Sequence, residues 1–299
     1  MESTKNRTLL MGICNVTPDS FSDGGKYFHT DAAIARAHQM VSEGAHIIDV
    51  GGESTRPGSV RLTAEAELQR IRDVVVALVK DGITVSVDTM HAQTAQVVAE
   101  IGAHIINDVS GGLADPRMYQ VVAANGCDYV CQHWRGDPAT MDQLTDYDGD
   151  VVGGVIAELR QRTDALLTAG VNAERIIWDP GLGFAKTAAG SWALLGATGT
   201  LVRESPSGRV LVGASRKRFL TSISEGGAQV PGAAHERDLA TAATTVVAVA
   251  GGAWAVRVHN ILTNAAALRC GRTNAGQQMG NGMQADSKLQ VGQIQRRQR

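Results

Sequence analysis

The stretch ITVSVDTMHAQTAQVVAEIGAHIINDVS, residues 83–110, decides the fold class. It contains two apolar runs of strand length, ITVSVDT and HIINDVS. Between them, Ala92–Ile101 has the periodicity of a helix and is followed by Gly102, a residue that suits a helix C-terminus. Strand, helix and strand in immediate succession form the unit from which parallel sheets are built.

The same alternation runs through the rest of the chain. Further strand-length runs are TLLMGICN, HIIDVGG, DYVCQHW, RIIWDPG, RVLVGAS and AWAVRVHN. Further helices are expected over Asp31–Glu43, Ala64–Lys80, Pro116–Ala124, Asp150–Ala169, Ser191–Arg203 and Ala234–Ala250. Eight strands that alternate with helices predict an α/β protein, a single (β/α)8 or TIM barrel, over residues 8–270. A doubly wound open sheet is the main alternative.

Composition restricts the partners. The net charge of the 299 residues is −2, which gives no diffuse positive field for nucleic acid or a membrane surface. An anionic ligand must therefore be held by a local cluster, which favours a small molecule. Because no apolar run is long enough for a signal-peptide core or a membrane span, we expect a cytoplasmic protein. Cys127 and Cys131 are spaced wrongly for a zinc knuckle and are expected to be buried thiols.

The C-terminal segment, residues 271–299, differs from the rest. It is polar, rich in Gly and Gln, free of aromatic residues and basic at its end. A segment of this composition cannot bury enough apolar surface to fold. We therefore predict a disordered tail outside the barrel.

Polar side chains end nearly every strand-length run. They are Asn15, Asp49, Asp88, Asn107, His133, Asp179, Ser215 with Lys217, and Arg257 with His259. The C-terminal strand ends of such a barrel converge on one mouth, where active sites of this fold are built. One acid at a strand end is usually a helix cap, but capping is a poor explanation for polar residues at eight successive ends. The pattern predicts an active site at the mouth.

Two pairs sharpen this prediction. Ser86 and Asp88 are two positions apart on one strand, and Arg257 and His259 are related in the same way, so each pair shares a face. Burying such charges without partners costs several kcal/mol, so a ligand or an opposite charge must face them. The alternative to a ligand site is an internal salt-bridge network in which Lys217 and Arg257 neutralise the aspartates.

A basic cluster follows the seventh strand run. In GASRKRFL, residues 213–220, the cations Arg216, Lys217 and Arg218 are consecutive. Such a cluster is usually a solvated surface. A site for an anionic or electron-rich ligand is the alternative, and the polar strand ends favour it.

The motifs MGICNVTPDSFSDGG, IIDVGGESTRPGS, VSVDT, INDVSGG, DPGLGFAK, VGASRKRF and VRVH resemble, in this order, those of bacterial dihydropteroate synthases. These are pterin-binding TIM-barrel enzymes of folate biosynthesis and the target of sulfonamides. The resemblance extends from about Leu9 to about Leu268. It implies a transferase that condenses 6-hydroxymethyl-7,8-dihydropterin pyrophosphate with 4-aminobenzoate to give 7,8-dihydropteroate and pyrophosphate.

The resemblance also implies residue roles. Pterin and pyrophosphate would be bound by Thr55, Asp88, Asn107, Asp179, Lys217, Arg257 and His259. A carboxylate such as that of Asp179 can accept hydrogen bonds from the paired N–H donors of a pterin edge. The flat guanidinium of Arg257 suits stacking on the pterin ring. The implied aminobenzoate pocket consists of Phe21, Thr55, Arg56, Pro57, Phe184 and Ser215. The implied catalytic residues are Asp23, Asp88 and Lys217, and Asn15 is the implied ligand of Mg²⁺.

The resemblance further implies a homodimer, and it leaves Arg216 and Arg218 as surface or loop-anchoring residues. Gln132 and Asn260 depart from the family pattern, which has Met and Asp there. Two other functions stay open. One is a pterin-dependent methyltransferase, which would lack the STRPG and SRKRF segments. The other is a catalytically silent pterin-binding paralogue, against which the complete residue set argues.

Overall fold

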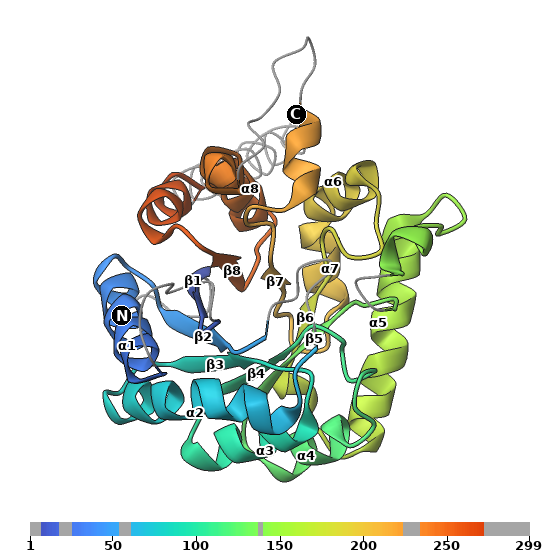
Figure 1. Ribbon diagram of the computed structural model, residues 1–299. Coiled ribbons are helices and arrows are strands. Elements are labelled where there is room, and N and C mark those ends of the chain that lie inside the picture. Colours follow the sequence, from blue (N-terminus) through green and yellow to red (C-terminus); the bar gives the residue numbers. More distant parts are fainter. Residues whose placement is uncertain (1–6, 18–25, 54–60, 137–139, 224–233, 272–299) are drawn as a thin grey trace, which may run out of the picture.

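The computed structural model describes residues 7–17, 26–53, 61–136, 140–223 and 234–271 (Figure 1). Its strands form one parallel sheet in the order β6-β5-β4-β3-β2-β1-β8-β7. The strands are β1 (Leu9–Asn15), β2 (Ile47–Gly51), β3 (Val85–Asp88), β4 (Ile105–Asp108), β5 (Asp128–Gln132), β6 (Ile176–Asp179), β7 (Leu211–Val212) and β8 (Ala255–Val258). An isolated parallel bridge between Trp178 and Val210 joins the two ends of the sheet. The predicted TIM barrel is confirmed, and the open-sheet alternative is excluded.

The helices surround the strands (Figure 1). They are α1 (Lys26–Ser42), α2 (Ala64–Lys80), α3 (Ala92–Ile101), α4 (Met118–Ala124), α5 (Val151–Thr168), α6 (Ala188–Gly196), α7 (Thr198–Glu204) and α8 (Asp238–Ala250). After β8, residues 261–271 are also helical, an element that the sequence analysis did not anticipate. Residues 272–299, most of the predicted tail, lie outside the described residues. None of the described helices has the length and apolar character needed to cross a bilayer.

Local sequence explains several helix ends. The Thr63 side chain caps α2 by accepting a hydrogen bond from Ala66 N, and Asp150 caps α5 through Gly153 N. Gly102 adopts φ 109° after α3, a left-handed conformation that glycine adopts without strain. The single helix predicted over residues 191–203 is wrong. Thr187 caps α6 three residues earlier, and the chain then breaks at Ala197 before α7 begins.

Alternation along the strands places an apolar layer inside the barrel. It consists of Met11, Ile47, Ile105, Val130, Ile177, Leu211 and Ala255. Moving two positions toward the C-terminal end of a strand keeps a side chain on the same face. On six of these strands that step leads to Ile13, Asp49, Asn107, Gln132, Asp179 and Arg257. Polar side chains therefore lie directly above the apolar layer, on the side of the barrel mouth.

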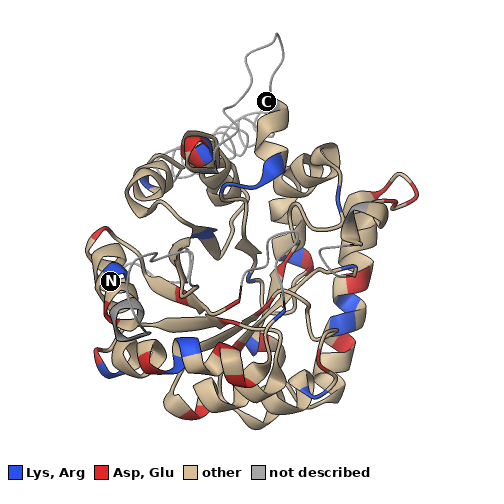
Figure 2. Cartoon of the chain, viewed as in Figure 1, with Lys and Arg blue, Asp and Glu red and all other residues tan. Residues whose placement is uncertain are grey.

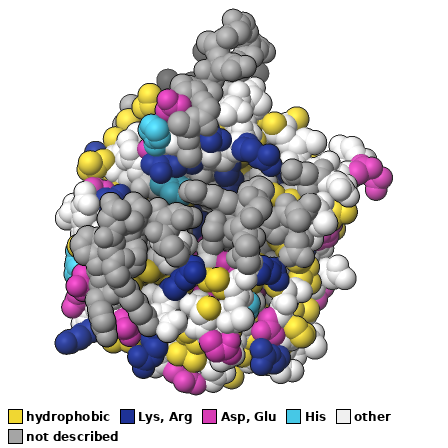
Figure 3. All heavy atoms as spheres, viewed as in Figure 1, with side chains coloured by type: hydrophobic (Ala, Val, Ile, Leu, Met, Phe, Trp, Pro, Cys, Tyr) yellow, Lys and Arg dark blue, Asp and Glu magenta, His cyan; other side chains and the backbone are white. Residues whose placement is uncertain are grey.

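The opposite faces of the strands pack beneath the helices and form the larger core. Three of the cysteines, Cys14, Cys127 and Cys131, are buried there as free thiols, as expected. Charged positions occur on the strands around the barrel axis as well as on the outer helices (Figure 2). On the face shown in Figure 3, basic and acidic side chains are interspersed, in keeping with the near-neutral net charge.

Candidate active site at the barrel mouth

Strand register sets Asn15, Asp88 and Asn107 side by side. Asn15 pairs with Gly51, Gly51 with Asp88, and Asp88 with Asn107. Because Gly51 has no side chain, Asn15 and Asp88 approach each other across it. A Cβ at Gly51 would lie 3.6 Å from Asn15 Oδ1 and 3.5 Å from Asp88 Cβ. Three residues predicted for the site therefore line one side of the mouth.

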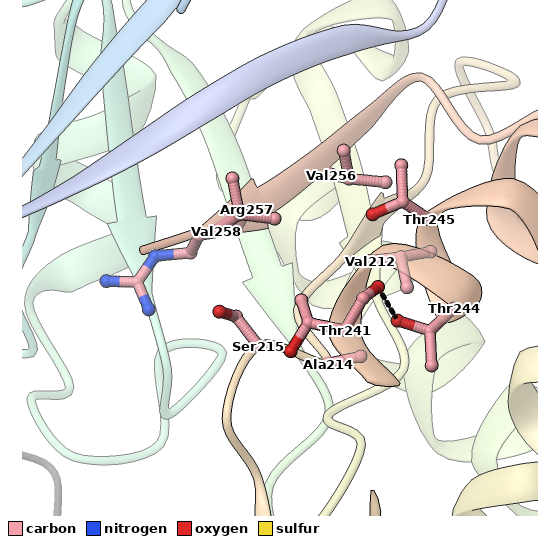
Figure 4. Close-up of a pocket in the computed structure, with 9 residues that line it drawn as sticks. All are labelled: Val212, Ala214, Ser215, Thr241, Thr244, Thr245, Val256, Arg257 and Val258. Atoms are coloured by element: carbon pink, nitrogen blue, oxygen red, sulfur yellow. Dashed lines mark hydrogen bonds between the residues drawn. The ribbon is translucent and has the colours of Figure 1, made fainter. Parts of the chain in front are cut away.

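Arg257 lies at the centre of this group. Its Nε donates to Asp49 Oδ2 at 2.6 Å, and its Nη2 donates to Asp88 Oδ2 at 2.7 Å. Asn107 Nδ2 donates to the same Asp49 oxygen at 3.1 Å. Figure 4 shows Arg257 extended away from Val256 and from the threonines of α8, into the barrel. The internal ion pair considered in the sequence analysis is thus present between Arg257 and Asp88. This ion pair also fixes the Arg257 side chain at the mouth.

Burial alters the acidity of Asp88. Desolvation raises its pKa to about 7, with a further increase from neighbouring Asp49, while the positive charge of Arg257 acts in the opposite direction. The Asp88 carboxyl can therefore hold or release a proton near neutral pH. Such poised acids are typical of functional sites.

Asp179 and Lys217 form the opposite side of the mouth. Asp179 Oδ1 accepts a hydrogen bond from Gly181 N at 2.7 Å, which leaves Oδ2 facing the barrel. A Cβ at Gly213 would lie 3.6 Å from Asp179 Oδ2 and 3.8 Å from Lys217 Nζ, so both groups converge beside this glycine. Burial raises the pKa of Asp179 despite the nearby Lys217, and it lowers the pKa of Lys217 to about 8. This carboxylate and amine can serve as an acceptor and a donor for a polar ring.

Phe184 and Ser215 lie on the same side. The Lys217 ammonium is 4.5 Å from the centre of the Phe184 ring, and Lys217 Nζ also donates to Leu182 O at 2.5 Å. Ser215 Oγ is 2.9 Å from His259 Nδ1 and accepts a hydrogen bond from His259 N at 3.2 Å. The turn after β7 and the turn after β8 are therefore joined at the mouth.

The members of the basic cluster lie in different surroundings, and Lys217 and Arg216 lie where the sequence analysis expected them. Arg216 adopts φ 59°, its guanidinium donates to both oxygens of Asp238 at 2.7 and 2.9 Å, and its N–H donates to Thr241 Oγ1. It is a loop anchor rather than a ligand contact. Asn260 supports the same carboxylate with a 3.1 Å hydrogen bond to Asp238 Oδ2. Lys217 is the member of the cluster that enters the barrel.

His133 does not face the mouth, contrary to the pattern of polar strand ends. Counting by two from Val130 places Gln132 on the inner face, where it pairs with Asp179 in register, and turns His133 outward. Gln132 Nε2 donates to Val109 O at 3.2 Å. His133 instead contacts Glu158 and Lys186. Alternation within the run DYVCQHW was the signal that could have assigned both residues.

The structure thus brings together nine of the predicted site residues. They are Asn15, Asp88, Asn107, Asp179, Phe184, Ser215, Lys217, Arg257 and His259. Asp49, which was counted as a strand end but given no role, belongs with them through Arg257. Phe21, Asp23, Thr55, Arg56 and Pro57 lie outside the described residues.

Asp49→Asn is expected to destabilise the protein by about 3 kcal/mol, because the variant removes the fully buried carboxylate from its ion pair and leaves half-buried Arg257 with one carboxylate instead of two. Urea unfolding measures this change. Asp73→Asn, an exposed position on α2, is the matched control and should change stability by less than about 0.5 kcal/mol. Equal stability of the two variants would show that Asp49 does not hold the arginine.

A barrel with a polar mouth of this composition defines an enzyme-like binding site, and comparison with known proteins identifies the class. The model of the family described as pterin binding enzyme matches residues 11–259, so the chain belongs to that family. The chain is 45% identical over 260 residues to the dihydropteroate synthase of Mycobacterium leprae (strain TN), an alignment that covers 87% of this chain and 91% of the relative. It is 42% identical over 261 residues to that of Synechocystis, covering 85% and 86%.

Solved structures show the same relationship. The crystal structure of dihydropteroate synthase from Clostridium difficile in the presence of pteroic acid superposes with a TM-score of 0.82 at 34% identity, covering 91% of this chain and 98% of that one. The Yersinia pestis enzyme in complex with a sulfonamide drug also gives 0.82, at 32% identity, covering 92% and 96%.

Proposed function

We infer that this chain is a dihydropteroate synthase. It joins 6-hydroxymethyl-7,8-dihydropterin pyrophosphate to 4-aminobenzoate and releases pyrophosphate. The observation that carries this conclusion is the convergence of Asp179 and Lys217 beside Gly213, in a chain whose relatives are dihydropteroate synthases. The acceptor and donor groups on the two sides of the mouth suit a ring with donors on one edge and acceptors on another.

Each side of the mouth matches one part of a pterin. The free Oδ2 of Asp179 can accept hydrogen bonds from the paired N–H donors, and Lys217 can donate to the carbonyl and a ring nitrogen. Asn107 can both donate and accept, as a mixed ring edge requires. Arg257 is held in place by two carboxylates, so its guanidinium is available to lie against the ring face.

The pyrophosphate group requires positive charge and hydrogen-bond donors. Arg257 and His259 lie at the end of β8, on the same rim as Asn15. We propose that Asn15 Oδ1 is a ligand of Mg²⁺. Among the described residues, no group of three or more His, Cys, Asp or Glu side chains is arranged to hold a metal. A single amide oxygen fits an ion that takes its other ligands from substrate phosphates and water, and the ion would neutralise charge on the departing pyrophosphate.

The reaction needs no nucleophilic side chain. The aminobenzoate amine attacks the exocyclic methylene of the pterin, the bond from that carbon to the pyrophosphate oxygen breaks, and the amine nitrogen gives up one proton to the departing pyrophosphate or to solvent. Lys217 and Arg257 stabilise charge at the mouth, and Asp88 is placed to hold a proton or offset positive charge on the pterin. Phe184 and Ser215 border the aminobenzoate. Asp23, Phe21, Thr55, Arg56 and Pro57 are proposed to complete the site, on the basis of the sequence resemblance alone.

Turnover tests the proposal. The purified chain is incubated with both substrates, and dihydropteroate is detected by mass spectrometry with and without Mg²⁺. We expect product only when both substrates are present, and at least about tenfold less product after chelation, because the metal stabilises the leaving group by more than about 1.4 kcal/mol. Tight pterin binding without product would identify a silent paralogue. Equal rates with and without Mg²⁺ would remove the metal from the account.

We also propose that the protein is a cytoplasmic homodimer. Leu239 on α8 has 78% of its surface exposed, and Leu262, on the following helix, has 62%. The proposal of a dimer rests on the sequence resemblance, and these two leucines are the most exposed large apolar side chains of the described residues. Light scattering at micromolar concentration should give the mass of two chains, and a monomer would contradict the proposal.

A further inference from the structure

A buried chain of hydrogen bonds runs behind the mouth, outside the site described above. Glu158 on α5 lies 3.0 Å from His133 Nε2, and His133 Nδ1 lies 2.9 Å from Lys186 Nζ. Lys186 Nζ also donates to Phe184 O at 2.9 Å. Because an ionised carboxylate only accepts hydrogen bonds, Nε2 of His133 carries the proton toward Glu158, and Nδ1 accepts a hydrogen bond from Lys186 Nζ. The chain therefore ends on the backbone of an aromatic residue at the mouth.

The two central groups of this chain are buried. His133 is fully buried, and Lys186 is 8% exposed. Desolvation lowers the pKa of His133 to about 3, and it lowers the pKa of Lys186 well below its usual value, with Lys217 acting in the same direction. Arg135 binds the same Glu158 carboxylate, so the outer end of the chain is fixed as well.

The loop that Lys186 holds contains a strained residue. Ala185 adopts φ 48°, in the left-handed region that costs a non-glycine residue about 1 kcal/mol or more. Such a conformation persists only where its surroundings impose it. Two bonds do so here: Lys186 Nζ binds Phe184 O on one side, and the Tyr147 hydroxyl donates to Ala185 O at 3.1 Å. Loss of either bond favours relaxation of Ala185, which would rotate the Phe184 peptide.

We propose that Lys186 is a positioning residue that fixes the Phe184 ring, and through it the place of the aminobenzoate, from behind the binding site. The inference rests on the proposed function, because it takes Phe184 as a wall of the aminobenzoate pocket. Lys217 donates to Leu182 O and Lys186 donates to Phe184 O in the same loop. Two lysine amines therefore hold two carbonyl groups of one loop.

Lys186→Met tests the inference, since Met keeps the length and apolar stem of the side chain but removes the donor. We expect KM for aminobenzoate to rise about 10- to 30-fold while KM for the pterin changes less than about threefold, because the pterin contacts of Asp179 and Asn107 do not pass through Phe184 O. Lys186→Gln, which retains an N–H donor, should recover part of the loss. Lys80→Met on the exposed end of α2 is the control and should match the wild type.

Tyr147→Phe provides an independent test if Lys186→Met does not fold. It removes the other bond that holds Ala185 and should raise KM for aminobenzoate in the same direction, by about three- to tenfold. Equal increases in both KM values, or a lower melting temperature with unchanged KM ratios, would show that Lys186 is merely structural and overturn the inference. An inactive wild-type chain would instead contradict the proposed function, so the two failures are distinguishable.

Discussion

Asp179→Asn is expected to weaken binding of the pterin substrate about 100-fold or more, with less than about threefold change for aminobenzoate. The amide oxygen can still accept the 2.7 Å hydrogen bond from Gly181 N, so the loop after β6 is retained. The group facing the barrel becomes an NH₂, which meets the pterin donors with another donor. Two unpaired donors in a buried pocket cost about 3 kcal/mol or more.

Calorimetry with the pterin ligand measures this change directly. Asp179→Ala should show a similar loss and also lower the melting temperature, because it removes the Gly181 bond. Asp164→Ala, an exposed position on α5, is the control and should leave both affinities unchanged. Unchanged pterin affinity in Asp179→Asn would show that this aspartate only caps the following turn and does not bind the pterin.

Lys217→Ala is expected to lower kcat/KM for the pterin substrate about 100-fold, or roughly 2.7 kcal/mol of transition-state stabilisation. Its amine lies at the mouth beside Asp179 and 4.5 Å from the centre of the Phe184 ring. Arg218→Ala should lower kcat/KM less than about tenfold. Lys217 and Arg218 both carry a positive charge. A difference between the kcat/KM values of the two variants therefore reports the position of the side chain and not its charge.

Arg216→Ala should behave differently from both. Its guanidinium binds Asp238, and its backbone has φ 59°, so its loss should lower the melting temperature and reduce kcat/KM for the two substrates by similar factors. Steady-state kinetics on the three variants decides the matter. Similar small losses of kcat/KM in all three variants would contradict the assignment of Lys217 to the site and support a solvated basic surface.

Regular patterns in the sequence predicted most of the architecture. The apolar runs of strand length became β1 to β8. The bounds of α2 and α3 agree with the prediction, because the Thr63 side chain caps α2 and Gly102 ends α3 in a left-handed conformation. Residues 261–271 were missed although ILTNAAALRCG has apolar residues at helical spacing. The break at Ala197 lies between Gly196 and Gly199, two poor helix formers that could have signalled it.

The candidate site was predictable where a residue ends a strand and faces inward. Asp88, Asn107, Asp179 and Arg257 meet both conditions. His133 meets only the first, and ignoring the alternation with Gln132 placed it at the mouth in error. The sequence analysis gave Lys186 no role, because a lysine in the turn GLGFAKT gives no sign that its amine is buried against a histidine from another strand.

The central claim, that this chain condenses two substrates at one mouth, is tested most directly by measuring both products in one reaction. Dihydropteroate and pyrophosphate are quantified together over time, with aminobenzoate present or omitted. We expect one pyrophosphate for each dihydropteroate, and neither product above background when aminobenzoate is omitted. Pyrophosphate released without aminobenzoate, or pterin bound with neither product formed, would contradict the claim.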